Sequence, residues 1–233
     1  MDWRRRFPSA WYGVSYLAPF SPVPGTIIGA AASNAPYVVI RRRRNKVARC
    51  APPRLNSVHM RVIETSRLTL LPQTAAHANE MFVVLSDPAI YEFENEPPPS
   101  AEWLCARFTK LETRRSADGN EQWLNWVIRL RTLELVGYVQ ATIRREGRAV
   151  IAYELSGAFW GRGLAHEAVD AMITELFDHY GVRNFAAVLK RGNLRSIRLL
   201  ERLGFILASP DEQTTYQVEP GEILMCRGGE PRV

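Results

Sequence analysis

The 233-residue chain contains little cysteine and histidine. Its three cysteines and four histidines are Cys50, Cys105, Cys226, His59, His77, His166 and His179. The cysteines are far apart and odd in number, and the histidines show no spacing typical of metal ligands. The sequence therefore gives no indication of a disulfide framework, a zinc site or another bound metal, and it favours a reducing, cytoplasmic compartment.

Long apolar runs are also missing. Residues 7–40 carry no charge, but five prolines interrupt them. The longest stretch there without proline, Gly25 to Ala35, is far shorter than the roughly 20 apolar residues that a membrane-spanning helix needs. Prolines in the apolar region likewise argue against a secretory signal after Arg4-Arg5-Arg6. We expect no association with a membrane.

Acidic residues are nearly absent from the first 60 positions, where nine arginines and one lysine face only Asp2. That segment carries a net charge of +9, so the rest of the chain carries −3 against a total of +6. The run Arg41 to Arg44 is typical of a nucleic-acid or membrane-surface patch. The mildly acidic remainder suits a cationic substrate better than a phosphate backbone, so we expect no nucleic-acid partner for it.

The N-terminal segment shows no sustained helical or strand periodicity. We predict that residues 1–59 are a disordered or non-native extension and that residues 60–233 form the functional domain. Met60 stands immediately before the first patterned segment, so we expect the native protein to start at or near it.

The remaining residues predict a mixed α/β fold. The expected order is a strand, two helices, three antiparallel strands, a helix, a strand, a helix and two strands. Strands are predicted at 67–71, 122–130, 135–145, 149–155, 185–189, 205–208 and 223–226. Helices are predicted at 75–86, 100–115, 164–180 and 193–203.

A glycine-containing loop, Trp160-Gly161-Arg162-Gly163, directly precedes the long helix predicted from Leu164. Glycines let backbone N–H groups approach an anion, and a helix N-terminus favours a pyrophosphate. The alternative is a loop whose glycines serve only turn geometry. The pattern is neither Gly-x-Gly-x-x-Gly nor followed by Gly-Lys-Ser/Thr, so it does not indicate a dinucleotide or nucleoside-triphosphate site.

A second motif follows downstream: Asn193-Leu-Arg-Ser196, apolar helix positions, and then Leu203-Gly204-Phe205. The two motifs at this separation resemble the GNAT superfamily of acetyltransferases, and within it the Rim-type branch that acetylates ribosomal-protein N-termini. The opening Ile63-Glu-Thr-Ser-Arg-Leu-Thr-Leu-Leu71 and the later Leu85-Ser-Asp-Pro88 are similar to that branch as well. The resemblance covers about residues 61–227.

The resemblance implies a single domain with a mixed, mostly antiparallel sheet flanked by helices, splayed between its fourth and fifth strands. Acetyl-CoA is the implied acetyl donor, with its pantetheine arm in the splay. The implied binding residues are Leu155, Ser156, Trp160, Gly161, Arg162, Gly163, Leu164, Ala165 and Asn193. Asn193 also fits a plain helix N-cap, and both roles can hold at once.

Acetyl transfer to an amine needs a neutral nucleophile, a donor for the developing oxyanion and a proton for the departing thiolate. A backbone N–H near Leu155 or Ser156 is expected to hold the oxyanion. Many superfamily members use a tyrosine as the acid, but Leu200 occupies that position here. The Rim-type motif makes Ser196 the alternative donor, although a surface hydroxyl is an equally good interpretation.

Four carboxylates are candidates for the general base. They are Glu154, on the strand beside the expected thioester, and Glu92, Glu94 and Glu96 in an acidic loop. Each also fits a plain surface carboxylate, and together the loop acids are expected to attract a cationic amine.

The expected function is an N-acetyltransferase that moves an acetyl group to a primary amine by direct attack in a ternary complex. A protein N-terminus is one acceptor implied by the resemblance, and small amines such as amino acids, polyamines or aminoglycosides are the alternative. A non-catalytic acyl-CoA-binding sensor or adaptor is a third reading, supported by the missing tyrosine and the arginine-rich N-terminal segment. We expect a monomer or a homodimer.

Overall fold

A computed structural model of the chain describes residues 59–93, 96–144, 147–216 and 218–228. The predicted extension, apart from His59, and the candidate base Glu94 lie outside these residues. Across the described ranges, no helix combines the length and the apolar character needed to cross a membrane.

The secondary structure follows the predicted order closely. The strands are β1 (Ile63–Glu64), β2 (Leu68–Pro72), β3 (Glu121–Leu130), β4 (Leu135–Arg144), β5 (Arg148–Leu155), β6 (Asn184–Lys190), β7 (Ile206–Leu207) and β8 (Glu222–Gly228). The α-helices are α1 (Ala78–Val84), α2 (Ala101–Leu111), α3 (Leu164–Tyr180), α4 (Leu194–Arg202) and α5 (Pro210–Thr215). Short 3-10 turns are η2 (Ala75–His77), η3 (Pro88–Glu92) and η4 (Gly157–Phe159).

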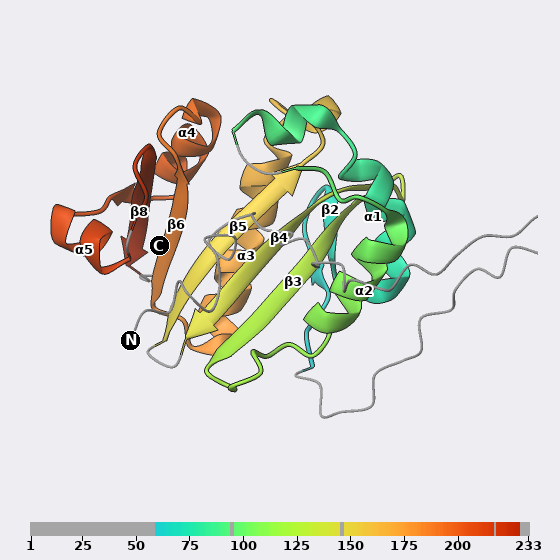
Figure 1. Cartoon of the computed structure of the whole chain (residues 1–233), viewed down its shortest axis with the longest axis horizontal. Helices are drawn as coiled ribbons and strands as arrows, with labels where there is room; N and C mark the ends of the chain where they lie inside the picture. Colours follow the sequence, from blue (N-terminus) through green and yellow to red (C-terminus); the bar gives the residue numbers. More distant parts are fainter. Residues whose placement is uncertain (1–58, 94–95, 145–146, 217, 229–233) are drawn as a thin grey trace, which may run out of the picture.

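The strands form one sheet in the order β1-β2-β3-β4-β5-β6-β8-β7 (Figure 1). Neighbouring strands are antiparallel throughout, except for the parallel pair β5 and β6. This arrangement confirms the predicted mixed, mostly antiparallel sheet flanked by helices.

Helices cover both faces of the sheet, as the alternation along β3 requires. Trp123 and Val127 of β3 pack in one cluster with α1 and α2. Leu124, Trp126 and Ile128 point to the other face and join the cluster that contains α3 and α4. The sheet is therefore buried on both sides, with the two helix pairs on opposite faces.

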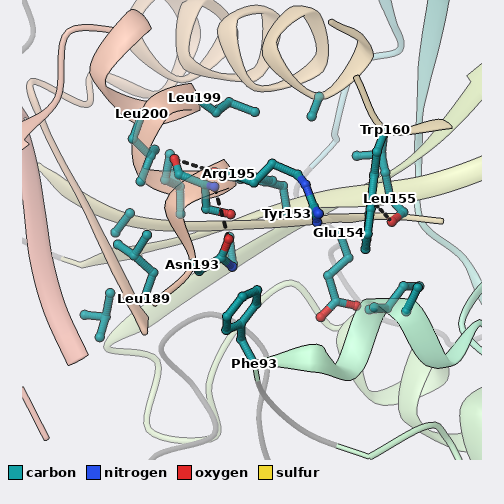
Figure 2. Close-up of a pocket in the computed structure, with 18 residues that line it drawn as sticks. Phe93, Tyr153, Glu154, Leu155, Trp160, Leu189, Asn193, Arg195, Leu199 and Leu200 are labelled. Atoms are coloured by element: carbon teal, nitrogen blue, oxygen red, sulfur yellow. Dashed lines mark hydrogen bonds between the residues drawn. The ribbon is translucent and has the colours of Figure 1, made fainter. Parts of the chain in front are cut away.

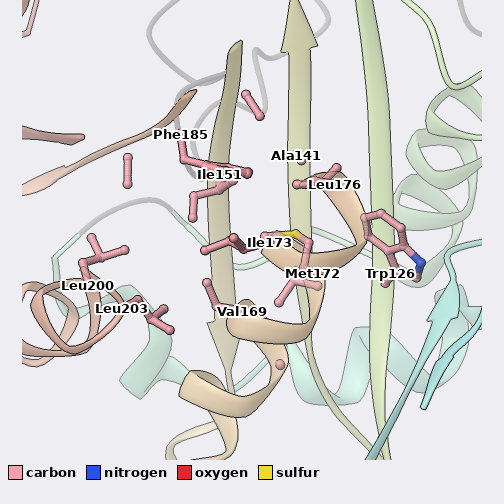
Figure 3. Packing of buried hydrophobic residues seen from close by; sticks show 14 of the residues in the cluster. Trp126, Ala141, Ile151, Val169, Met172, Ile173, Leu176, Phe185, Leu200 and Leu203 are labelled. Carbon is pink, nitrogen blue, oxygen red and sulfur yellow. The ribbon is translucent and has the colours of Figure 1, made fainter. Parts of the chain in front are cut away.

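The long helix α3 packs through one apolar stripe. Figure 3 shows Met172, Ile173 and Leu176 lying against Ile151 of β5 and Trp126 of β3, all in the same buried cluster. Burying side chains of this size stabilises the fold by about 1.5–3 kcal/mol each relative to exposure. This packing fixes the N-terminus of α3 relative to β5.

Three local features differ from the predictions. The helix expected at 75–86 begins as the 3-10 turn η2, because the His77 and Ala78 amides donate to carbonyls three residues earlier, those of Thr74 and Ala75. Helix α5 was not predicted, although Ser209 and Glu212 form a capping box around Pro210 that marks its start. The short strand β1, which pairs antiparallel with β2, was not predicted either.

Candidate functional site

Strands β5 and β6 separate after a short paired segment. They pair only at Arg148–Asn184, Ala149–Phe185 and Val150–Ala186, although β5 continues to Leu155 and β6 to Lys190. The two strands diverge visibly beyond this point (Figure 1). The predicted splay is thus present, and it leaves backbone N–H and C=O groups of both strands facing a gap without a strand partner.

A cavity of about 150 Å³ occupies this gap (Figure 2). Its walls come from β5, β6, the first turn of α3 and the loop before it, α4 with its N-cap, and η3 with the residue that follows it. The lining residues are Ala89, Ile90, Phe93, Ile151, Ala152, Tyr153, Glu154, Leu155, Trp160, Ala165, Ala187, Val188, Leu189, Asn193, Arg195, Ser196, Leu199 and Leu200. The lining is mostly apolar with a few polar groups, which is typical of a small-molecule site.

The glycine loop has the geometry that anion binding needs. Gly161 and Gly163 have φ values of +73° and +74°, a conformation that side chains other than glycine rarely adopt. Gly163 is the N-cap of α3 and has no side chain to accept from the first amides of the helix. The first-turn N–H groups of α3 therefore lack an intrahelical partner and favour a negatively charged ligand.

A carboxylate in the first turn of α3 is fully engaged by the segment before β2. Glu167 Oε1 accepts from Thr65 Oγ1 at 2.6 Å, Ser66 Oγ at 3.0 Å and the Arg67 amide at 2.9 Å. Its Oε2 accepts from Arg67 Nε at 2.6 Å, and Arg67 Nη1 donates to the Arg162 carbonyl at 2.8 Å. We call these four residues, 65–67 and 167, the Glu167 clamp.

The Glu167 clamp supports the glycine loop, and within it Arg67 neutralises the charge of the Glu167 carboxylate. Burial raises the pKa of Glu167, but hydrogen bonds from Thr65, Arg67 and Ser66 lower it to about 2. The carboxylate is thus ionised yet paired with Arg67, so it does not repel an anion at the helix N-terminus. Nothing in the sequence of the Thr-Ser-Arg segment indicates this role, because its partner lies 100 residues further along the chain.

Arg195 of α4 is a second residue that sequence reasoning missed, although it lies inside the Asn-x-x-Ser motif. Its guanidinium lies 3.7 Å from the centre of the Trp160 ring, and Figure 2 shows it extended from α4 toward that ring. Trp160 in turn donates its indole N–H to the Leu155 carbonyl at 2.8 Å. These contacts place a positive charge at the glycine loop from the opposite side of the gap. The guanidinium of Arg162, 5.3 Å from the centre of the Phe159 ring, supplies a second positive charge at this loop.

Asn193 and Ser196, two of the candidate site residues, both line the cavity. The Asn193 side-chain oxygen accepts from the Ser196 amide at 3.1 Å, so Asn193 is the N-cap of α4 while its NH₂ group remains for a ligand. The Tyr153 hydroxyl donates to the Ser196 carbonyl at 3.4 Å. Burial raises the pKa of Tyr153 to about 12, which keeps this unpredicted cavity hydroxyl protonated. Leu200 is buried and contributes no donor.

Glu154 supplies the only carboxylate among the described residues that line the cavity. Its side chain extends toward the η3 side of the gap (Figure 2). Burial and the neighbouring charge of Glu154 raise the pKa values of Tyr138 and Tyr91 above the ordinary tyrosine value. Glu154 therefore lies beside two neutral phenols. Glu92 and Glu96 are exposed and lie outside the lining.

The two backbone amides considered for an oxyanion differ in availability. The Ser156 amide donates to the Val136 carbonyl at 3.0 Å. Since hydrogen bonding alternates along an antiparallel pair, the amide of Leu155 points away from β4 and toward the gap.

The comparisons with known proteins decide the family. A family model described as the acetyltransferase (GNAT) domain matches residues 67–206, which is more than half of the chain. The chain belongs to the GNAT acetyltransferase family. The sequence-based identification of a GNAT N-acetyltransferase enzyme is thereby confirmed.

Related GNAT proteins and structures agree with this assignment. The chain is 28% identical over 162 residues to the uncharacterised N-acetyltransferase YoaA of Bacillus subtilis, covering 67% of this chain and 89% of that protein. It has the fold of RimL, a ribosomal L7/L12 alpha-N-protein acetyltransferase solved with coenzyme A, at TM-score 0.61 and 18% identity. That match covers 72% of this chain and 98% of RimL. The self-immunity acetyltransferase MccE, solved with acetyl-CoA and AMP, matches at TM-score 0.58 and 18% identity, covering 70% and 93%.

The GNAT site has the features that coenzyme A requires. A slot between two strands offers unpaired backbone groups to an amide-containing arm. Helix α3 offers N–H groups at its start, and two arginines lie beside the loop. Within the described residues, no group of three or more His, Cys, Asp or Glu side chains is placed to hold a metal ion.

Proposed function

We propose that the protein transfers an acetyl group from acetyl-CoA to a primary amine held in the gap between β5 and β6. The observation that carries this proposal is the parting of these strands next to the glycine-capped start of α3. The reaction forms an amide C–N bond and breaks the thioester C–S bond. The amine loses one proton, and the departing sulfur takes one up.

Residues on the α3 side bind the donor. The amides of Gly161 to Ala165 and the Arg162 side chain hold the diphosphate, and Arg195 adds charge across the gap. The NH₂ group of Asn193 and the Leu155 and Ser156 segment hold the pantetheine arm. Trp160 packs between these groups.

Residues near Leu155 act on the reacting atoms. The Leu155 amide is aimed into the gap and suits the negative charge that develops on the acyl oxygen. Ser196 presents a hydroxyl to the cavity, and we assign it the hydrogen bond to the departing sulfur. Tyr153, whose hydroxyl donates to the Ser196 carbonyl, holds this part of α4 in place. No covalent enzyme adduct is needed, because the amine attacks directly.

Glu154 lies on the acceptor side and accepts a proton from the amine. A single carboxylate in an otherwise apolar wall attracts one positive charge, and it takes up the proton when the amine becomes nucleophilic. An α-amine has a pKa near ~8, so it needs little assistance at neutral pH. We favour a protein N-terminal α-amine, since RimL and other Rim-type enzymes share the fold.

Thiol release measured on the full chain with acetyl-CoA tests the proposal. The panel contains peptides with free α-amines, matched N-blocked peptides with lysine, and small amines such as amino acids, polyamines and aminoglycosides. We expect turnover with free α-amine peptides and at least a tenfold loss for Glu154→Gln, which is typical of losing a general base. Turnover with small amines and none with the peptides would mean that the acceptor is a small amine and not a protein N-terminus. Coenzyme A binding without turnover on any amine would favour the sensor reading.

A further inference from the structure

The segment of residues 87–93, which we call the strap, lies across one side of the gap. It contains η3 and supplies Ala89, Ile90 and Phe93 to the cavity wall. At its far end the Phe93 ring lies against Gly192, where an added Cβ would come within 3.5 Å of ring atom Cε1. The strap therefore reaches from the end of β5 to the loop before α4, and it forms the acceptor-side wall.

At its near end the strap is held by one carboxylate. Asp87 Oδ2 accepts from the Gly157 amide at 2.7 Å and from Ser156 Oγ at 3.0 Å. Its Oδ1 accepts from the Ala89 amide at 3.0 Å, within the strap itself. The backbone N–H groups of Ala89 and Gly157 lower the pKa of Asp87, so the carboxylate is ionised at neutral pH and its hydrogen bonds are charge-assisted.

The close approach of Gly157 to the strap fits the same arrangement. A Cβ at Gly157 would lie 3.2 Å from Ala89 Cβ and 3.3 Å from Asp87 Oδ2, which is tighter than an ordinary contact. Gly157 thus lets the loop after β5 pack directly on the strap. The Ser-Asp-Pro motif found in the sequence is the part of the chain that makes this junction, and the proposed chemistry gives it no role.

We propose that Asp87 is a positioning residue that fixes the acceptor-side strap to the loop that begins the coenzyme site. The strap and the loop after β5 then hold each other in place, so that a ligand that orders the loop also orders the strap. The proposal rests on the proposed function, which identifies the strap as the acceptor-side wall and the loop after β5 as the start of the coenzyme site. The coupling itself is a property of the chain without any ligand.

Hydrogen–deuterium exchange on the full chain tests this coupling without and then with coenzyme A. In the ligand-free protein, Asp87→Asn is expected to speed exchange roughly tenfold in both 88–93 and 157–163, the effect of one lost hydrogen bond to a charged group. Ser156→Ala changes only the loop, yet it is expected to speed exchange in the strap. Gly157→Ala tests the same junction by steric pressure if Asp87→Asn folds poorly.

Asp118→Asn is the matched control. Asp118 also accepts from a serine hydroxyl and a backbone amide, but in the exposed turn before β3. It is expected to leave exchange in 88–93 unchanged. With coenzyme A, the wild type is expected to gain protection in both segments, whereas Asp87→Asn gains it only in 157–163.

The outcomes separate the two proposals. Unchanged strap exchange in ligand-free Ser156→Ala, or strap protection by coenzyme A that survives in Asp87→Asn, would overturn the role of Asp87. If coenzyme A gave no protection in wild-type 157–163, the proposed function would fail, while the ligand-free comparison would still decide the coupling.

Discussion

Replacing Glu167 with glutamine removes the centre of the Glu167 clamp. The carboxylate accepts four hydrogen bonds, and a glutamine presents an NH₂ group to at least one of the same donors. A carboxyl whose pKa falls from 4.5 to about 2 on folding contributes about 3 kcal/mol at neutral pH. Glu167 is only 16% exposed, so solvent screens little of this. For a protein of this size, Glu167→Gln should lower Tm by about 5–10 °C.

The pH dependence of the stability difference between the wild type and Glu167→Gln tests this reasoning. Because the folded-state pKa is depressed, the stabilisation is fully present above about pH 4.5 and is lost as pH falls toward about 2. Urea unfolding of the wild type and Glu167→Gln should therefore differ by about 3 kcal/mol at pH 7 and pH 5, and by roughly half as much at pH 3. Glu134→Gln, in the exposed loop between β3 and β4, is the control and should show no such difference. Equal stability at pH 7, or a difference that persists undiminished at pH 3, would refute the reasoning.

Three further outcomes follow from the site. Gly163→Ala, at φ +74°, should weaken coenzyme A binding about tenfold by calorimetry, because the ligand-free loop relaxes away from the left-handed conformation and its return on binding costs about 1–2 kcal/mol; an unchanged Kd would contradict this. Arg195→Met should raise the same Kd roughly three- to fivefold through the lost Trp160 contact, whereas exposed Arg198→Met should not. In thiol-release assays Ser196→Ala should lower kcat more than it raises KM for acetyl-CoA, and full kcat would remove Ser196 as the donor. Tyr153→Phe, which loses the hydrogen bond to the Ser196 carbonyl, should lower kcat more weakly.

Much of the fold was predictable because its signals are local. The apolar stripe of α3, its end at Gly181 and the alternation in β3 depend on residues a few positions apart, and these elements appear within one or two residues of the predicted bounds. The glycine loop and the N-cap Asn193 were found for the same reason. Helix α5 was missed even though Ser209, Pro210 and Glu212 carry a local start signal.

The parts that were not predicted depend on contacts between distant segments. Glu167 meets residues about 100 positions earlier, and Asp87 meets Ser156 about 70 positions later. Tyr153 was overlooked beside Glu154 because strand alternation sends the two side chains to opposite faces, and only the position of α4 brings the tyrosine to Ser196. The spacing of residues along the sequence does not show which distant segments lie side by side in the fold.

The measurement that tests the central claim most directly is calorimetric titration of the full chain with coenzyme A. The gap between β5 and β6 and the free amides of α3 predict saturable binding of one coenzyme A per chain, weakened by Gly163→Ala. An absence of heat and of any thermal shift with millimolar coenzyme A would contradict the account.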